Sequence, residues 1–226
     1  MIARRRWLAH CSASLLAGPA LAALPSFAVA ARAATPQTIL VVGDSLSAEY
    51  GLQRGSGWVA LLAERLAREY PQASVINASI SGDTTAGGLT RLPALLRQHR
   101  PTLVVLELGG NDALRGLPLD ATRSNLVEMA KLAKAAGARL LILGMQIPPN
   151  YGRSYGERFA AMFDEVSRSQ GAALVPFLLK GVADGPQAEA MFQADRVHPV
   201  AAAQPKILET IWRELKPMLG ASTRSP

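Results

Sequence analysis

Five short apolar segments alternate with longer amphipathic segments along most of the chain. The apolar segments span residues 39–42, 75–78, 103–108, 140–143 and 172–175. Between them and after the last, apolar side chains recur at helical spacing, around residues 58–66, 89–98, 126–133, 159–166 and 207–215. Nearly uniform apolar strands joined by helices are typical of a parallel sheet that helices cover on both faces. The pattern therefore predicts an α/β fold, with Pro93 limiting where the second helix begins.

Polar residues that could carry chemistry follow the first three predicted strands, after residues 42, 78 and 108. In a parallel sheet of this kind, ligands bind beyond the carboxyl ends of the strands. We therefore expect these three segments to meet at one edge of the sheet and to form the functional site there.

The segment Gly43-Asp44-Ser45-Leu46-Ser47 directly follows the first predicted strand. Gly43 permits a tight turn, and a serine here would lie at the carboxyl edge of the sheet. Two interpretations are open from this segment alone: Ser45 is a nucleophile, or it caps the following helix. The Gly-x-Ser-x-Gly elbow of α/β-hydrolases is not matched, because Ser47 stands where its second glycine would be.

Asp195 and His198 precede the last predicted helix. A carboxylate three residues before an imidazole can reach its Nδ1, which fixes the tautomer and leaves Nε2 free to take a proton from a serine. A cap beside a surface histidine is the alternative. Of the two other histidines, His10 lies in the N-terminal segment, and His99 lies at a predicted helix end, where the helix dipole explains it. His198 is therefore the candidate base for Ser45.

Gly82 and Asn111 follow the second and third predicted strands. Gly82 lets a backbone N–H approach a ligand closely, and the Asn111 amide can donate to a developing oxyanion. Taken singly, each residue can also be explained as turn chemistry. Both interpretations remain open until the two residues are considered together with Ser45 and His198.

Residues 1–33 have the pattern of a secretory signal. Three arginines near the start form a positive region, residues 7–31 carry no charged side chain, and small residues precede the expected cleavage site near Ala33. An uncleaved membrane anchor is the alternative, but two prolines interrupt the segment. We expect export by the Sec or the twin-arginine route, and a single domain over residues 34–226 that is periplasmic or secreted, without a stable membrane span after cleavage.

The composition excludes several kinds of site and partner. Residues 1–33 hold four of the 24 basic residues and no acid, so the remainder has 20 basic against 17 acidic residues, which is too even to indicate nucleic-acid binding. Cys11 is the single cysteine, which excludes a disulfide framework and a thiolate metal site. Metal-ligand spacings, a phosphate loop and a dinucleotide fingerprint do not occur, so we expect no metal and no cofactor. Nothing in the sequence requires an oligomer, and we expect a monomer.

Four blocks, taken together and in this order, resemble those of the SGNH (GDSL) hydrolase family. They are residues 43–47, Gly82 after the second strand, Gly-Gly-Asn-Asp at 109–112, and Asp195-x-x-His198-Pro199. Further segments at 75–84, 91–99, 106–112 and 148–155 resemble the family's bacterial periplasmic thioesterase, lysophospholipase and arylesterase members. The resemblance covers about residues 38–216, nearly all of the predicted domain.

The resemblance implies a flavodoxin-like, three-layer fold with five parallel strands. It implies that Ser45 is the nucleophile, His198 the general base and Asp195 the acid that orients it. It also implies an oxyanion hole formed by the N–H of Ser45, the N–H of Gly82 and the side-chain amide of Asn111. The expected reaction is acyl transfer to water through an acyl-enzyme, without a metal or cofactor.

The expected substrate is a small or lipid-like carboxylic ester or acyl thioester. Candidate acyl-binding residues on loops that should border the carboxyl edge are Leu46, Ile147, Pro148, Tyr151 and Tyr155, although ordinary loop packing would also account for them. Two other functions stay open: a carbohydrate acetylesterase, and a non-catalytic periplasmic binding domain that has kept the fold.

Two charged residues depart from the family pattern. Close members often have glycine where Glu49 and Arg196 stand. Neither change removes a catalytic group, so we expect the two side chains to affect substrate preference and not hydrolysis itself.

Overall fold

The structure, a computed structural model, describes residues 36–220. Its five strands form one parallel sheet in the order β2-β1-β3-β4-β5. They are β1 (Gln37–Gly43), β2 (Ala73–Asn77), β3 (Leu103–Glu107), β4 (Arg139–Leu143) and β5 (Ala173–Val175). This is the flavodoxin-like strand order, so the fold class expected from the sequence is confirmed. The predicted signal segment, residues 1–33, lies outside the described residues.

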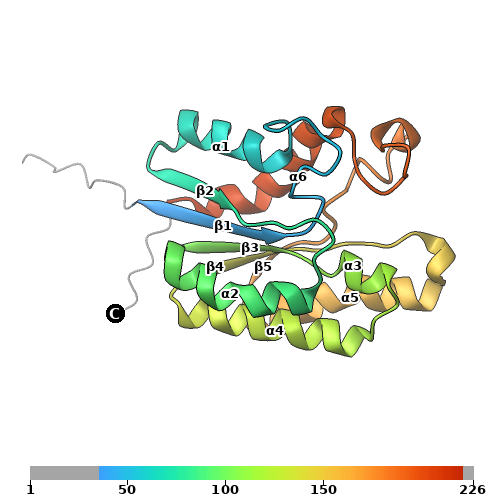
Figure 1. Ribbon diagram of the computed structural model, residues 1–226, viewed down its shortest axis with the longest axis horizontal. Helices are drawn as coiled ribbons and strands as arrows, with labels where there is room; N and C mark the ends of the chain where they lie inside the picture. Colours follow the sequence, from blue (N-terminus) through green and yellow to red (C-terminus); the bar gives the residue numbers. More distant parts are fainter. Residues whose placement is uncertain (1–35, 221–226) are drawn as a thin grey trace, which may run out of the picture. The chain divides into compact units, whose positions relative to one another are not determined.

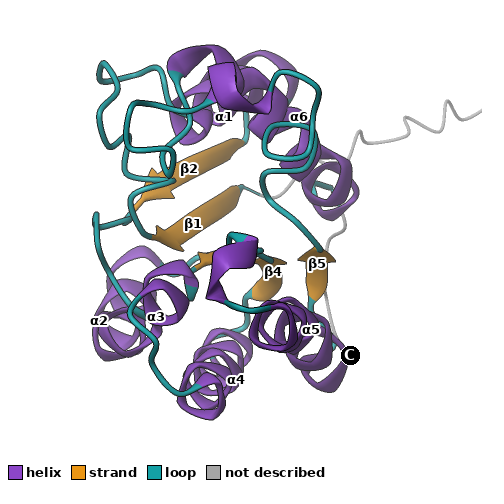
Figure 2. Cartoon of the chain, turned by 90° about the vertical axis from the view of Figure 1, so that its right-hand side faces the viewer, coloured by secondary structure: helices purple, strands orange, loops and turns teal. Residues whose placement is uncertain are grey.

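Helices cover both faces of the sheet, as Figures 1 and 2 show. One face carries α1 (Trp58–Glu69) and α6 (Gln204–Leu215), which pack against each other. The other face carries α2 (Thr85–His99), α4 (Leu119–Ala135) and α5 (Arg153–Gln170), and the short helix α3 (Gly110–Leu114) follows β3. Four 3₁₀ helices complete the described chain: η1 (Pro149–Tyr151), η2 (Ala188–Met191), η3 (Ala201–Ala203) and η4 (Lys216–Met218).

The core forms where the apolar segments predict it. Every residue of β3 is buried, as are the last five residues of β1, because these two strands have neighbours on both sides and helices above and below. The edge strand β2 is only partly buried. The helices contribute one apolar face each; in α4 this face comprises Leu119, Thr122, Leu126, Met129, Ala130 and Ala133.

The expectation that Pro93 limits the start of the second helix is wrong. Helix α2 begins at Thr85, eight residues earlier, and Pro93 lies inside it. An internal proline costs roughly 3 kcal/mol because it removes one hydrogen bond and crowds the preceding turn. The helix nevertheless continues, since Leu92 and Leu96 on either side of Pro93 are buried against the core. Here tertiary packing outweighs the local preference of the chain.

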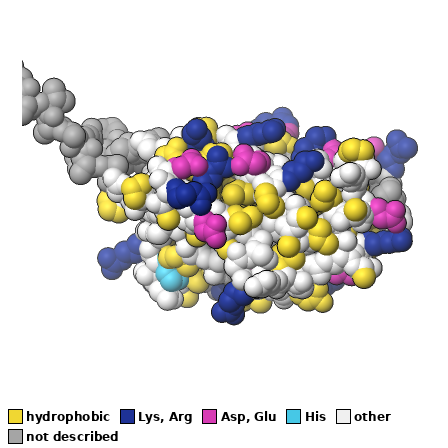
Figure 3. All heavy atoms as spheres, turned by 90° about the horizontal axis from the view of Figure 1, so that it is seen from above, with side chains coloured by type: hydrophobic (Ala, Val, Ile, Leu, Met, Phe, Trp, Pro, Cys, Tyr) yellow, Lys and Arg dark blue, Asp and Glu magenta, His cyan; other side chains and the backbone are white. Residues whose placement is uncertain are grey.

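The outer surface of α1 and α6 carries charges of both signs. Figure 3 views the molecule from this side and shows basic and acidic side chains interspersed over it. Arg65 of α1 pairs with Glu209 of α6 and with Glu69, and its guanidinium lies 4.1 Å from the ring centroid of Trp212. These contacts join the two helices at their surface. Over residues 36–220, every helix is too short or too polar to cross a membrane.

Candidate active site

The loops after β1, β2 and β3 meet at the carboxyl edge of the sheet, which faces the viewer in Figure 2. The loop after β1 carries Ser45, the loop after β2 carries Gly82, and α3, after β3, carries Asn111. The helices that follow the adjacent strands β1 and β3, which are α1 and α4, lie on opposite faces of the sheet, so the topological switch point falls between these two strands. The fold therefore brings the sequence-predicted site residues together at the position where α/β sheets bind ligands.

Ser45, His198 and Asp195 form a continuous chain of hydrogen bonds. The distance from Ser45 Oγ to His198 Nε2 is 2.8 Å, and the distance from His198 Nδ1 to Asp195 Oδ2 is 2.7 Å. The second Asp195 oxygen accepts the backbone N–H groups of His198, at 3.0 Å, and Val197, at 2.9 Å. These backbone hydrogen bonds, together with the imidazole, lower the pKa of Asp195 to about 2. The carboxylate is therefore ionised and holds Nδ1 as the protonated nitrogen.

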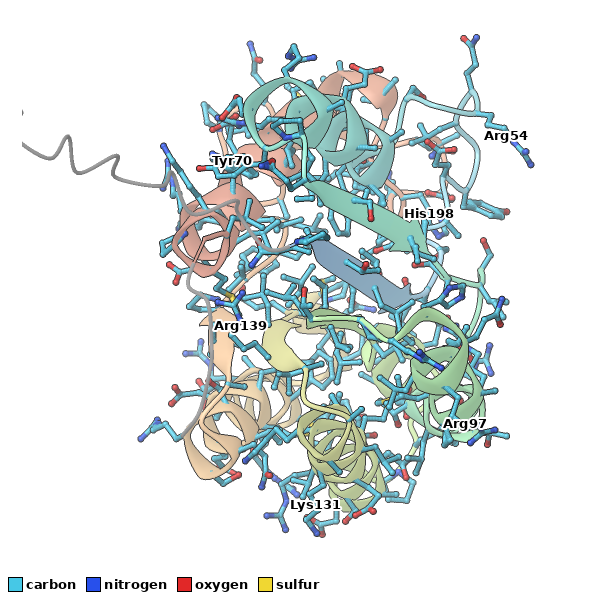
Figure 4. All side chains as sticks on the ribbon, turned by 90° about the vertical axis from the view of Figure 1, so that its left-hand side faces the viewer. Arg54, Tyr70, Arg97, Lys131, Arg139 and His198 are labelled. Atoms are coloured by element: carbon cyan, nitrogen blue, oxygen red, sulfur yellow. The ribbon has the colours of Figure 1, made fainter. Side chains whose placement is uncertain are left out.

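The local turn before His198 explains how two consecutive residues, Val197 and His198, present three nitrogen atoms to one carboxylate. Arg196 adopts a left-handed conformation, with φ of 58°, and this folds the chain back so that both following N–H groups face Asp195. The carbonyl of His198 then accepts the N–H of Gln193, at 2.8 Å. Figure 4 labels His198 on the side of the molecule where Arg54 lies and away from Arg139, which begins β4.

Tyr50 covers one face of the His198 imidazole, a contact that the sequence analysis did not find. The two ring centroids are 4.3 Å apart and the rings are tilted by 38°. Gln193 holds the two loops together, since its side-chain amide donates to the carbonyls of Tyr50, at 2.9 Å, and Pro199, at 3.2 Å. Half of the Tyr50 surface stays exposed. An aromatic residue five positions after the serine is too weak a signal in the sequence to indicate this contact.

Three hydrogen-bond donors that the sequence predicts for an oxyanion hole are free to bind a ligand in the described part of the chain. Within residues 36–220, the hydrogen bonds of loops and side chains leave the N–H groups of Ser45 and Gly82 without a partner. Asn111 donates one amide hydrogen to Asp44, at 2.9 Å, and its second amide hydrogen remains for a ligand. Gly82 has φ of 79°, a conformation that favours glycine, and Arg115 donates to its carbonyl at 2.8 Å. The carbonyl of Gly82 thus points toward Arg115.

Arg91 of α2 fastens the loop after β2 to the end of β1. It donates to Asp83 Oδ2 at 2.8 Å, to the carbonyl of Gly43 at 3.2 Å and to the carbonyl of Ala78. The Asp83 and Arg91 side chains are 11% and 19% exposed, so the pair is largely shielded from water. The loop that carries Gly82 therefore has a fixed position relative to the strand that carries Ser45.

Two buried carboxyl groups, Asp44 and Glu107, lie directly beneath the site. Glu107 Oε2 accepts the N–H of Asp44, at 3.2 Å, and the hydroxyl of Ser47, at 2.7 Å. Burial raises the pKa of Asp44 to about 6, and burial together with the nearby charge of Asp44 raises the pKa of Glu107 well above its usual range. Glu107 is a site residue that the sequence analysis missed, although a single acid in an otherwise apolar strand was the available signal.

A cavity of about 460 Å³ opens beside Ser45, Asn111 and His198. Three predicted acyl-binding residues, Leu46, Ile147 and Pro148, line it. Tyr151 and Tyr155 do not, because Tyr151 lies in the exposed helix η1 and the Tyr155 hydroxyl is turned toward the carbonyls of Ala113 and Leu117. Its other apolar lining comes from residues that the sequence analysis did not single out: Leu114, Met145, Phe177, Leu179, Ala183, Phe192 and Val197.

The two residues that depart from the family pattern have different surroundings. Both lie at positive φ, 61° for Glu49 and 58° for Arg196, which is the conformation that glycine adopts most easily. The Glu49 carboxylate accepts the N–H groups of Gly55 and Gly57 just before α1, and it does not line the cavity. Arg196 does line the cavity, and its guanidinium is 3.5 Å from Glu189. Of the two, only Arg196 is placed to contact a substrate.

Among residues 36–220, His, Asp and Glu side chains do not gather in groups of three that could hold a metal ion. The polar groups around Ser45 are instead its hydroxyl, the His198 imidazole with the Asp195 carboxylate behind it, and the N–H donors of Ser45, Gly82 and Asn111. This set can remove a proton from a hydroxyl, stabilise the resulting imidazolium and neutralise an oxyanion, which are the requirements of acyl transfer.

Comparisons with known proteins agree with this chemistry. Residues 41–204 match the model of the GDSL-like lipase/acylhydrolase family. Esterase TesA of Pseudomonas aeruginosa is 54% identical over 186 residues, covering 82% of this chain and 91% of that protein. Thioesterase 1/protease 1/lysophospholipase L1 of Escherichia coli strain K12 is 42% identical over 188 residues, covering 83% and 88%. The crystal structure of TesA superposes with a TM-score of 0.78 at 55% identity, covering 81% of this chain and all of that one.

Proposed function

The chain belongs to the GDSL-like lipase/acylhydrolase family and is a carboxylic ester hydrolase, and we propose that Ser45, His198 and Asp195 are its catalytic triad. The observation that carries the assignment is the unbroken hydrogen-bond chain from Ser45 Oγ through the imidazole to Asp195. The alternative of a non-catalytic binding domain would not require a hydroxyl, a base and an orienting carboxylate to be aligned beside a cavity.

The first step forms the acyl-enzyme. Ser45 Oγ attacks the carbonyl carbon of the substrate while His198 Nε2 takes the hydroxyl proton. The carbonyl π electrons move to the oxygen, and the oxyanion receives hydrogen bonds from the N–H of Ser45, the N–H of Gly82 and the Asn111 amide. Asp195 stabilises the imidazolium that forms. When the tetrahedral intermediate collapses, the carbon–leaving-group bond breaks and His198 gives its proton to the departing alcohol or thiol.

The second step releases the acid. Water attacks the acyl carbon, and His198 Nε2 removes one of its protons as the oxyanion forms again. Collapse of this intermediate breaks the bond to Ser45 Oγ, and His198 returns the proton to that oxygen. The serine and the neutral imidazole are thereby restored, and the net reaction consumes one water molecule.

We propose acyl esters and acyl thioesters as the substrates, with the acyl chain in the cavity. The lining is predominantly apolar and includes Leu46, Leu114 and Ile147, which suits a hydrocarbon chain. One methylene in a snug apolar pocket is worth roughly 1–3 kcal/mol, and less in an open groove, so several chain lengths should be accepted. The relatives named as an esterase and as a thioesterase and lysophospholipase support both substrate classes.

The test is hydrolysis of p-nitrophenyl esters from acetyl to palmitoyl, and of palmitoyl-CoA, by residues 34–226. Ser45→Ala should abolish hydrolysis of every substrate, whereas the control Ser124→Ala, at an exposed position on α4, should behave as the parent protein. The chain-length profile distinguishes a short-acyl arylesterase from a long-acyl thioesterase. Hydrolysis that persists in Ser45→Ala would contradict the triad.

We further propose that residues 1–33 direct export to the periplasm and that the mature enzyme is a monomer. The apolar, uncharged segment after the first arginines supports the export signal. N-terminal sequencing of the protein from a periplasmic fraction should begin near residue 34, and light scattering should give the mass of a single chain. Retention of the full-length chain in the membrane fraction would contradict the first proposal, and a dimer mass the second.

A further inference from the structure

A directed series of hydrogen bonds runs from the core to the proposed oxyanion hole. Trp58 Nε1 donates to Ser47 Oγ at 3.2 Å, and Ser47 Oγ donates to Glu107 Oε2 at 2.7 Å. Glu107 contacts the Asp44 carboxyl group, whose Oδ2 accepts the amide of Asn111 at 2.9 Å. All five side chains belong to segments that surround Ser45, and none of them takes part in the proton transfers of the proposed mechanism.

The chemistry of the groups fixes the direction of each bond. An indole nitrogen can only donate, so the Ser47 oxygen accepts from Trp58 and must use its own hydrogen on Glu107. Glu107 Oε2 then already accepts two hydrogens, one from Ser47 and one from the N–H of Asp44. The remaining Glu107 oxygen is the place for a proton, which it shares with Asp44.

The two carboxyl groups together carry one negative charge near neutral pH. Asp44 and Glu107 are 3% and 2% exposed, and two adjacent charges at such depth repel each other strongly. The groups that face Asp44 are Glu107 from β3, Asn111 from α3, the N–H of Leu46 and the His198 imidazole. Asp44 accepts the N–H of Leu46 and the amide of Asn111 and lies near the imidazole, and all three favour a charge on Asp44, so we place the proton on Glu107.

We propose that ionised Asp44 is a positioning residue that holds the Asn111 side chain with its NH₂ group toward the substrate oxygen. The proposal rests on the oxyanion role proposed above for Asn111. A carboxylate can only accept, so it binds the NH₂ side of the amide at 2.9 Å and repels the amide oxygen. If the amide turned over, its oxygen would face both Asp44 and the oxyanion. A neutral group in place of Asp44 accepts either orientation and removes this selection.

The expected effect follows from the worth of one oxyanion donor, which is about 10²–10³ in kcat. Asp44→Asn keeps the shape of the side chain and an oxygen for the N–H of Leu46, but it can donate to the Asn111 oxygen and so permits the reversed amide. At pH 8 we expect kcat to fall at least tenfold while KM changes less than about threefold. The matched control Asp164→Asn, the same change on the far helix α5, should leave both constants as in the parent protein.

A double-mutant cycle separates positioning from a general structural effect. In the Asn111→Ala background there is no amide to orient, so Asp44→Asn should then change kcat by less than about twofold. An equal loss in both backgrounds, or no loss from Asp44→Asn alone, would overturn the proposal. Failure of the proposed function is distinguishable, because it would appear as activity in Ser45→Ala or as unchanged kcat in Asn111→Ala.

A second measurement needs no substitution at Asp44 and so does not depend on the folding of that variant. Below about pH 6 Asp44 takes up a proton, and His198 must also be neutral for catalysis. In a plot of log(kcat/KM) against pH, the acid limb of the parent protein should therefore have a slope greater than one. The slope should fall to one in Asn111→Ala, whose residual activity no longer depends on Asp44. Equal slopes in the two proteins would refute the positioning role.

Discussion

Glu107 offers a test of the buried carboxyl pair through stability alone. Its side chain is 2% exposed and its pKa is raised well above the usual value of 4.5 by burial and by the charge of Asp44. The folded protein therefore holds a proton on Glu107 in a range of pH where the unfolded chain has released it. Because the unfolded state binds fewer protons there, the free energy of unfolding falls as pH rises from about 4.5 toward the folded pKa.

Glu107→Gln removes this dependence, since glutamine does not titrate but still offers an oxygen to Ser47 and an N–H to Asp44. Release of one proton corresponds to about 1.4 kcal/mol per pH unit. The free energy of unfolding of the variant should therefore rise relative to that of the parent protein by up to this amount for each pH unit. For a domain of this size, 1 kcal/mol shifts Tm by about 2–4 °C, and the Tm difference should therefore grow by roughly 3–6 °C per pH unit. At the low end of this range we expect the free energy of unfolding of the variant to be lower by about 1–3 kcal/mol, because glutamine buries one additional N–H.

The assay is thermal unfolding followed by circular dichroism at half-unit steps from pH 6.5 to 8.5 and constant ionic strength. This range lies above the pKa of about 6 of Asp44, so that group stays ionised in the folded protein. The control is Glu64→Gln at an exposed position of α1, whose Tm should run parallel to that of the parent protein. A constant Tm difference between Glu107→Gln and the parent protein would refute the assignment of the proton to Glu107.

Four further substitutions have expected outcomes. Gly43→Ala places a Cβ 2.8 Å from Glu107 Oε2, so we expect a loss of about 1–3 kcal/mol in urea unfolding and lower kcat, and an unchanged midpoint would contradict the close contact. Glu49→Gly and Arg196→Gly both replace a residue in the left-handed conformation with glycine, but only Glu49→Gly loses hydrogen bonds to the backbone. Tm should therefore fall for Glu49→Gly and stay level or rise for Arg196→Gly. A Tm change of the same sign in both variants would contradict this reasoning. Asp195→Asn should lower kcat/KM for p-nitrophenyl esters by about 10³–10⁴, because the imidazolium loses its partner, and a loss below tenfold would contradict the triad.

The elements of the fold were predictable because apolar spacing reflects burial directly. All five strands and the helices α1, α2, α4, α5 and α6 overlap the segments that this spacing predicts, although α4 and α5 begin seven and six residues earlier than their apolar stripes. The wrong expectation at Pro93 arose because a local preference was weighed without the packing of Leu92 and Leu96. The short helix α3 was missed because its residues Gly110–Leu114 carry turn signals and too few apolar positions to show a period.

The positions of the candidate site residues were predictable where a polar residue follows the end of a strand, as with Ser45 and Asn111. Neighbours that depend on contacts between distant segments were not predictable. Tyr50 and His198 are 148 positions apart in the sequence, and the fold brings their rings into contact. Glu107 lies beside Asp44 because β1 pairs with β3. Glu49 is also such a residue. Its place in the sequence suggests a charge near the site, whereas in the structure its carboxylate accepts the backbone N–H groups of Gly55 and Gly57.

In the mechanism proposed above, three carboxyl groups lie close to a reaction that develops negative charge, and their protonation states account for how the site accommodates that charge. Glu107 is held neutral, so the ionised groups are Asp195 and Asp44. Both attract the imidazolium that forms together with the oxyanion, and the same attraction lowers the pKa of Asp44 from what burial alone would give. Asp44 reaches the oxyanion through the Asn111 amide, and a hydrogen bond from that amide to a carboxylate polarises it and strengthens its second N–H as a donor. A second negative charge, on Glu107, would repel the oxyanion without a hydrogen-bond donor between the two. A carboxyl pair that keeps one proton avoids this repulsion.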